Sequence, residues 1–386
     1  MTMRIAALAS TASLLAVAAC DGGRAAGPTA AAVVGIDATS SVLTPADAEV
    51  VMRGLDNPRG LTFGPDGALY VAEAGRGTTD RACFDVPTPE DCACAARAMI
   101  VCYGPTGAVS RLFRGRQERI VTGLPSYANA NGRAVGPHDI AMLGVGSAHV
   151  TIGLEESPAF RDAASASFPE FASFGTLVRV TPGGAWRQVA DLAAYEQAVN
   201  PDPRIFDSNP YGLLAVAGQT FVADAGGNSL LAVRANGEVS TLAVMPVVPQ
   251  TATGTGDAVP TSIVVGPDGA YYVGVLTGAP WRDGFASVYR LEPGGTPQPY
   301  RTGFKGILDI AFDAAGRLLV LQHSSGLTGI GNPGLLVRVS ADGSARETLL
   351  EGLVRPTSVA IGADGAIYVT NRGLTPGAGE VLRIAP

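Results

Sequence analysis

Oxygen-bearing side chains stand at the ends of several short apolar segments of this sequence, where they could bind a cation. They are Glu73, Asp139, Asp224 and Asn371, and His138 stands beside one of them. Ca²⁺ takes roughly six to eight oxygen ligands, and a bound divalent ion can act as a Lewis acid while a histidine moves protons. If these residues converge, the sequence predicts a calcium site in a hydrolase or lactonase, with His138 as the candidate catalytic residue.

These residues belong to two sets of positions in a repeated pair of strands, and we expect both sets to approach the mouth of one channel. The starts of the first strands supply Arg59, His138, Asp139, Tyr211, Thr261, Asp309 and Thr357. The ends of the second strands supply Glu73, Ile152, Asp224, Val275, Gln322 and Asn371. The candidate ligand-binding residues are Arg59, Glu73, His138, Asp139, Tyr211, Asp224, Asp309, Gln322 and Asn371. A structural role stays open, because such side chains also bind free backbone N–H groups at strand starts.

The elements that would position these residues come from one unit that occurs six times. It is clearest in Gly54–Gly75, where two apolar runs flank a Gly-Pro-Asp-Gly turn, a pattern that predicts a hairpin. The central apolar residues of the six first strands are Leu61, Ile140, Leu213, Ile263, Ile310 and Val359. Their separations, 79, 73, 50, 47 and 49 residues, approach the repeat of roughly 45 residues that is typical of a β-propeller.

The predicted fold is therefore all-β: a six-bladed β-propeller with four antiparallel strands per blade. The last copy ends at Pro386 without a fourth strand, and Glu49–Arg53 would supply it and close the ring. A seven-bladed ring is the alternative, but no seventh copy is found. Five of the six third strands carry arginine at one position, which we interpret as structural pairing across strands or between blades; they are Arg111, Arg179, Arg290, Arg338 and Arg383.

The long connections all follow even-numbered strands, so they should project from one face of the propeller. They span residues 76–106, 154–174, 191–210 and 246–258, whereas the other turns are short. Loops on a rigid scaffold commonly carry function. We therefore expect the site on this face, around the mouth of the channel. The alternative is that the long loops are surface insertions that the fold tolerates and that have no function.

Four cysteines lie in the first of these insertions, at Cys83, Cys92, Cys94 and Cys102. In an exported chain they predict two disulfides. Either Cys83 pairs with Cys92 and Cys94 with Cys102, or Cys83 pairs with Cys94 and Cys92 with Cys102. A zinc site is the alternative.

The N-terminus predicts export and attachment to a membrane. Residues 1–20 combine Arg4, an apolar run and Cys20 after Val-Ala-Ala, which resembles a bacterial lipoprotein signal; an ordinary cleavage site is the alternative. Residues 21–48 would be a flexible tether and 49–386 a single propeller in the cell envelope, lipid-anchored through Cys20 and expected to be monomeric. The net charge of −7 without a basic run argues against a nucleic-acid partner.

Several segments together resemble the ScyD/ScyE family over residues 50–386. They are NPRGLTFGPDGALYVAEAG at 57–75, CYGPTGAV at 102–109, GPHD at 136–139, DSNPYGLL at 207–214 and TNRG at 370–373. The resemblance implies an exported six-bladed propeller similar to NHL and gluconolactonase-like proteins, and implies no particular reaction. Because the residues supply no complete acid–base or nucleophile set, the sequence favours a binding module for a small molecule, glycan or protein over the metal-dependent hydrolase.

Overall fold

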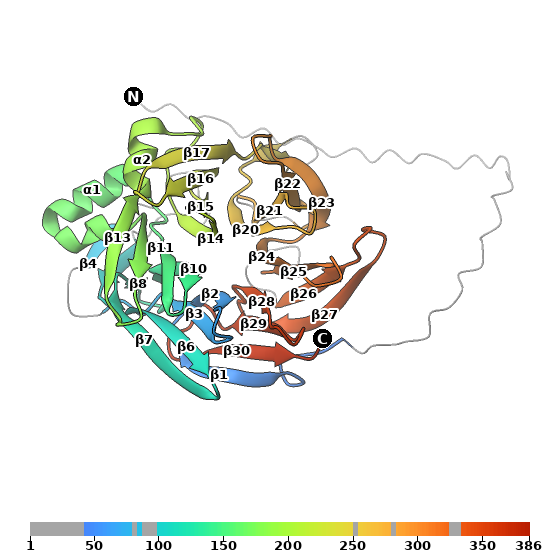
Figure 1. Ribbon diagram of the computed structural model, residues 1–386. Helices are drawn as coiled ribbons and strands as arrows, with labels where there is room; N and C mark the ends of the chain where they lie inside the picture. The colour runs from blue at the N-terminus through green and yellow to red at the C-terminus, as the bar shows by residue number, and fades with distance from the viewer. Residues whose placement is uncertain (1–41, 79–82, 87–98, 250–253, 279–282, 324–332) are drawn as a thin grey trace, which may run out of the picture. The chain divides into compact units, whose positions relative to one another are not determined.

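Six four-stranded antiparallel sheets of one pattern follow one another along the chain (Figure 1). The structure is a computed structural model that describes residues 42–78, 83–86, 99–249, 254–278, 283–323 and 333–386. These residues form one unit, which begins at Val42. In the first five sheets the strands pair in the order in which they occur in the chain.

In each of these five sheets, every strand is hydrogen-bonded to the next one along the sheet. The first sheet contains β2 (Pro58–Phe63), β3 (Leu69–Glu73), β6 (Gly107–Phe113) and β7 (Arg116–Leu124). The second contains β10 (Pro137–Gly144), β11 (Ser147–Ile152), β12 (Thr176–Val180) and β13 (Trp186–Asp191). The third contains β14 (Pro210–Val216), β15 (Gln219–Asp224), β16 (Ser229–Arg234) and β17 (Val239–Val244). The fourth contains β20 (Pro260–Val265), β21 (Tyr271–Val275), β22 (Ala286–Leu291) and β23 (Gln298–Phe304). The fifth contains β24 (Ile307–Phe312), β25 (Leu318–Gln322), β26 (Gly334–Val339) and β27 (Arg346–Leu353).

The sixth sheet joins the two ends of this unit. Its strands are β28 (Val359–Ile361), β29 (Ile367–Asn371), β30 (Gly379–Ile384) and the N-terminal β1 (Glu49–Leu55). β1 runs antiparallel to β30, with Glu49 opposite Arg383 and Arg53 opposite Glu380. The pairing expected between these two segments is therefore present. Just before β1, Leu43 forms a bridge with Leu350 of the fifth sheet, so the last residues of the expected tether contact this unit.

The first strands of successive sheets contact one another in the order β2, β10, β14, β20, β24 and β28, and β28 contacts β2 (Figure 1). Each neighbouring pair of sheets encloses its own apolar core. Tyr70 and Ile140 pack between the first and second sheets, and Met52 and Leu61 pack between the sixth and the first. A sheet that packs against a neighbour on each face needs apolar side chains on both faces, which explains the continuous apolar runs.

The first insertion forms a small sheet of its own with a segment that follows the first blade-like sheet. This sheet contains β4 (Cys83–Val86), β5 (Met99–Tyr103), β8 (Tyr127–Asn129) and β9 (Ala134–Val135). Val101 and Tyr127 pack with Phe171 and Phe174, so the insertion shares a core with the second insertion, which the sequence did not indicate.

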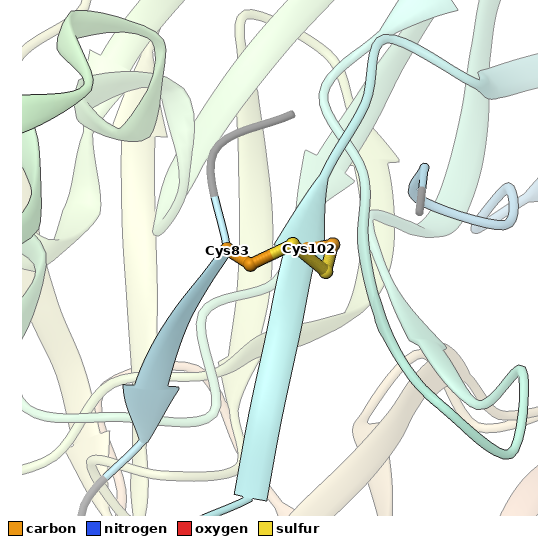
Figure 2. Close-up of a disulfide and its surroundings, with 2 residues drawn as sticks. All are labelled: Cys83 and Cys102. Carbon is orange, nitrogen blue, oxygen red and sulfur yellow. A yellow bond between two sulfur atoms is a disulfide. The ribbon is translucent and has the colours of Figure 1, made fainter. Parts of the chain in front are cut away.

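A disulfide joins Cys83 to Cys102 (Figure 2). Both pairings expected from the sequence are therefore wrong for these two cysteines. The physical reason is the register of β4 and β5, which are antiparallel and place Cys83 directly opposite Cys102. Cys92 and Cys94 lie outside the described residues.

The remaining long connections contain helices and a short strand pair. The second contains α1 (Pro158–Ser167), capped by the Ser157 hydroxyl, and the 3₁₀ helix η1 (Pro169–Ser173). The third contains α2 (Leu192–Val199), capped by the Asp191 carboxylate, in agreement with the preference for such residues at helix starts. β18 (Val248–Pro249) pairs with β19 (Thr255–Gly256) in the fourth. Within the described part of the chain, no helix is both long and apolar enough to span a membrane.

The arginines that recur in the third strands form pairs, as expected. Arg111 pairs with Glu118 at 2.5 Å, Arg290 with Asp268 at 2.8 Å, Arg338 with Glu347 at 2.7 Å and Arg383 with Asp364 at 2.8 Å. Arg179 donates to the Ser147 hydroxyl instead, at 3.3 Å. We call the four ion-paired residues, Arg111, Arg290, Arg338 and Arg383, the blade arginines.

Candidate functional site

A cavity of about 850 Å³ opens where the first strands begin, on the side of the long connections. The first strands contribute Arg59, Tyr211, Thr261 and Leu308. The long connections contribute the acidic residues Glu155, Asp207 and Asp257. The cavity therefore lies on the face that the insertion lengths predicted.

Arg59 enters the wall of this cavity from β2 and is only 5% exposed. One terminal nitrogen donates to the Ala134 carbonyl oxygen at 2.7 Å, and its Nε has no hydrogen-bond partner in the described residues. No carboxylate of the described residues forms an ion pair with it. Burial lowers the pKa of Arg59, and nearby Arg133 lowers it further, while Tyr211 and Glu155 act in the opposite direction. Arg59 is thus a buried cation without an anionic partner.

Arg133 and Arg355 lie on the same wall. Arg133 forms an ion pair with Glu155, and the negative charge of Glu155 is the main cause of a raised Arg133 pKa. Arg355 lies 3.1 Å from the Nε2 of His323 and has a positive φ of 48°, a conformation that is uncommon for residues other than glycine. Burial and then Arg133 lower the pKa of Arg355. We call Arg59, Arg133 and Arg355 the mouth arginines.

The Nε2 of His323 accepts the bond from Arg355, because this histidine is neutral. Burial lowers its pKa to about 4, and the charge on Arg355 contributes to the same shift. A neutral imidazole has one nitrogen free to accept a hydrogen bond. His323 therefore orients the Arg355 guanidinium without neutralising its charge.

Carboxylates gather on another part of the wall and behind it. Burial, followed by the charge on Asp224, raises the pKa of Asp207 to about 6. The same two causes raise the pKa of Glu196, behind the wall, to about 8, and burial followed by Asp207 raises that of Glu156 to about 7. Asp257 and Asp283 have cations of their own, Arg204 at 4.0 Å and Lys305 at 3.3 Å. Asp207 is thus a cavity-lining carboxyl group that exchanges its proton near neutral pH.

The candidate residues at the ends of the second strands share one structural role. Each accepts a hydrogen bond from a backbone N–H that precedes the first strand of its own sheet. Glu73 accepts from Asp56 at 2.6 Å, Asp224 from Asn209 at 2.6 Å, Gln322 from Lys305 at 2.8 Å and Asn371 from Val354 at 2.7 Å. Glu73 also binds Arg119 at 2.7 Å. None of these four residues lines the cavity, and within the described residues no group of three His, Cys, Asp or Glu side chains could hold a metal.

The aspartates and serines at the starts of the first strands connect neighbouring sheets. Asp139 accepts from the N–H of Leu213 at 2.7 Å, and Asp309 accepts from that of Val359 at 2.9 Å. Ser262 and Ser358 make the equivalent bonds to the next strand. Asp139 and Asp309 line a second cavity of about 440 Å³, toward the short turns. Burial raises the pKa of both, and for Asp139 the charge on Asp309 adds to the effect.

His138 is fully buried beside Tyr211, with 5.0 Å between the two ring centroids. Burial, and then the charge on Arg59, lower its pKa to about 3, so the imidazole is neutral at physiological pH. A side chain at Gly153 would come within 2.1 Å of the ring, which shows how closely the chain is packed there. His138 thus lies behind Tyr211, while Tyr211 lines the cavity.

Of the ligand-binding candidates from the sequence, Arg59 and Tyr211 line this cavity. Arg133, Glu155, Asp207 and Arg355 line it too and were not among the candidates. A signal existed for Glu155 and Asp207, since both lie in long connections that were expected to form the functional face. No comparable signal marked Arg133, in the turn between β8 and β9, or Arg355, just before the sixth sheet.

Comparisons with known proteins show the fold. No family model matches this chain, and no curated protein matches its sequence. Among solved structures, the calcium-binding protein regucalcin from Agrobacterium tumefaciens has a TM-score of 0.52 at 16% identity, covering 89% of this chain and 95% of its own. A glucose dehydrogenase has a TM-score of 0.52 at 14% identity, covering 88% and 99%, and a luciferin-regenerating enzyme has 0.50 at 12%, covering 88% and 95%. At these identities the likeness shows a β-propeller fold similar to theirs.

Proposed function

We propose that the described unit is a closed six-bladed propeller and that its function resides in the cavity at the mouth. The cyclic contacts of the six first strands and the pairing of β1 with β30 support closure. The ScyD/ScyE family remains our proposal for its relationship. A closed ring would hold the first strands rigidly, which suits a site that depends on the relative positions of residues from different sheets.

The cavity is proposed to bind a small molecule, and its volume of about 850 Å³ is the observation that carries this proposal. Ligand sites commonly occupy roughly 300–1,000 Å³ and combine apolar walls with a few convergent polar groups. Here Leu276 and Leu308 provide apolar surface, and Arg59, Tyr211 and Asp207 provide polar groups. A glycan or a protein segment could occupy the same mouth, and its binding would be an outcome of the experiment below.

A hydrolase or lactonase acting in this cavity is the second candidate, and the comparisons fit it at least as well. The observation that favours it is Asp207, whose pKa of about 6 suits a general base near neutral pH. In this hypothesis Asp207 takes a proton from a water molecule that attacks the carbonyl carbon of an ester or lactone. The tetrahedral intermediate then breaks its bond to the alkoxy oxygen, which receives that proton from Asp207 and leaves as the alcohol. The mouth arginines stabilise the negative charge that develops on the carbonyl oxygen.

Binding and turnover can be separated with variants at this one carboxyl group. Wild type, Asp207→Asn and the control Glu351→Gln, an exposed carboxylate outside the cavity, would be compared in lactone and aryl-ester hydrolysis and in thermal shift with a small-molecule library. Hydrolysis that is lost only in Asp207→Asn supports the enzyme. Ligand-dependent stabilisation without turnover supports the binding module. If no compound binds and no substrate reacts, the cavity is not the functional site.

Calcium is tested separately, because Glu73, Asp139, Asp224 and Asn371 do not line the cavity and no step is assigned to a metal. Elemental analysis and calcium titration against melting temperature would be performed on wild type, Glu73→Gln and Asp224→Asn. One ion per chain, lost in these variants, would support the calcium hypothesis that the sequence suggested. A protein that binds no calcium and is indifferent to it would remove that hypothesis.

We also propose that the protein is exported, lipidated at Cys20 and anchored to a membrane of the bacterial envelope as a monomer. Residues 1–41 lie outside the described residues, so the sequence carries this proposal. Cell fractionation of Cys20→Ala should release the protein from membranes or leave an unprocessed precursor. A soluble wild-type protein with its N-terminus elsewhere would contradict it, and size-exclusion chromatography with light scattering tests the monomer.

A further inference from the structure

We infer that the ligand carries an oxyanion group, such as a carboxylate or a phosphate, and that Arg59 and Arg355 bind it; the inference rests on the small-molecule site proposed above. Arg59 is 5% exposed, lines the cavity and has a buried Nε without a hydrogen-bond partner among the described residues. A buried charge is costly unless it is paired. A pairing group supplied by the ligand would remove that cost.

The distribution of charges on this wall supports the inference. The mouth arginines bring three positive charges, and the one ion pair that they form with a carboxylate of the described residues is that of Arg133 with Glu155. The other carboxylates do not make up the difference. Asp257 and Asp283 pair with Arg204 and Lys305, and no ion pair in the described residues joins Asp207 to a mouth arginine. Two guanidinium groups are therefore left without a counter-charge in the described residues.

Both unpaired arginines are held in place by neutral acceptors. The Ala134 carbonyl oxygen binds Arg59, and the imidazole of His323 binds Arg355. Neutral acceptors fix the orientation of a guanidinium without consuming its charge. The planar fork of an oriented guanidinium matches the two oxygens of a carboxylate or phosphate, so this wall is pre-organised for an oxyanion.

Anion titrations of the full-length protein test the inference. Inorganic phosphate and citrate would be the anionic probes and glycerol the neutral one, at constant ionic strength, with melting temperature and calorimetric affinity as readouts. We expect both anions, and not glycerol, to stabilise wild type. Arg59→Met and Arg355→Met should each weaken anion binding by at least about tenfold, since charge-assisted hydrogen bonds contribute that much. Arg338→Met, a blade arginine outside the cavity, is the matched control and should bind as wild type does.

The outcomes separate this inference from the function on which it rests. Circular dichroism verifies the fold of each variant, and Arg355, which is more exposed than Arg59, keeps the test valid if Arg59→Met does not fold. The inference is overturned if anions neither bind to the wild type nor raise its melting temperature. It is also overturned if Arg338→Met loses as much anion affinity as the two mouth variants. If a neutral library compound then binds and raises the melting temperature, the proposed small-molecule site stands without its anionic ligand. If neither kind of compound binds, both fail.

Discussion

The blade arginines and the mouth arginines use the same side chain in opposite ways. Arg338, at the side of a blade-like sheet, pairs with Glu347 on the neighbouring strand. Arg59, at the mouth, is more deeply buried and has no carboxylate partner in the described residues. A repeated arginine that pairs with a carboxylate of its own sheet, on the fourth strand or in the first turn, stabilises the strands themselves. Arg59 and Arg355 do not recur in the other sheets and have no carboxylate partner within the described part of the chain, which is why we propose that they serve a ligand.

The two groups of arginines also differ in what they contribute to the free energy of unfolding. An exposed ion pair contributes about 0.2–1 kcal/mol to stability, so the blade arginines matter little individually. A buried charge without a partner costs several times more, as an order of magnitude. The unpaired charge of Arg59 therefore lowers the stability of the ligand-free protein, while Arg59 and Arg355 keep their positive charges available to a ligand. The blade arginines change the stability of the protein little in either direction.

The largest effect is expected where a paired buried charge is turned into an unpaired one. Arg119→Met would leave Glu73, which is fully buried, with only its hydrogen bonds to Ser110 and the Asp56 N–H. We expect the free energy of unfolding to fall by about 3 kcal/mol, measured by chemical denaturation. The double variant Glu73→Gln/Arg119→Met should recover part of it. A loss as large in the double variant would show that packing, and not charge, is responsible.

The next effect is a pH dependence from the carboxylates behind the mouth. Burial and Asp224 raise the pKa of Glu196 to about 8 in the folded protein, above its ordinary value of 4.5. The folded state then binds the proton more tightly, so the stability that this proton contributes is fully present below pH 4.5 and is lost as pH rises toward 8. Glu196→Gln should remove on the order of 1 kcal/mol of this loss, measured by denaturation at pH 5 and pH 8. Parallel curves for the variant and wild type would contradict it.

A smaller effect of opposite sign is expected for Arg59→Met in the absence of ligand. Removing an unpaired buried cation and retaining the volume should raise the free energy of unfolding by about 1 kcal/mol, measured by denaturation without anions. The Ala134 carbonyl loses its hydrogen bond, which limits the gain. A destabilised variant would mean that Arg59 has a structural partner, and would remove the contrast with the blade arginines.

The smallest effect is expected for Arg338→Met. Its pair with Glu347 lies near the surface, so the free energy of unfolding should fall by less than about 1 kcal/mol. High salt screens the ion pair, so it should lower the free energy of unfolding of the wild type toward that of the variant. A loss as large as that of Arg119→Met would show that the blade arginines hold the sheets together.

The sequence by itself determined the repeat, the six successive sheets, the pairing of the segment before Arg53 with the segment after Gly379, and the face that carries the long connections. These features follow from local patterns: Gly-Pro-Asp-Gly turns, apolar runs and connection lengths, which act over a few residues. The tertiary structure alone decided the disulfide partner of Cys83. Its partner depends on the register between β4 and β5, which places Cys83 opposite Cys102, and that register cannot be read from the cysteine spacing.

The same division applies to the site. The sequence placed Glu73, Asp224 and Asn371 at strand ends, but only the folded chain shows that backbone N–H groups occupy their oxygens. The sequence could not show that Arg59 and Arg355, which lie near opposite ends of the domain's sequence, line one cavity. Whether a polar side chain is free to bind a ligand depends on the partners that other segments bring to it, and those partners are fixed only when the sheets pack against one another.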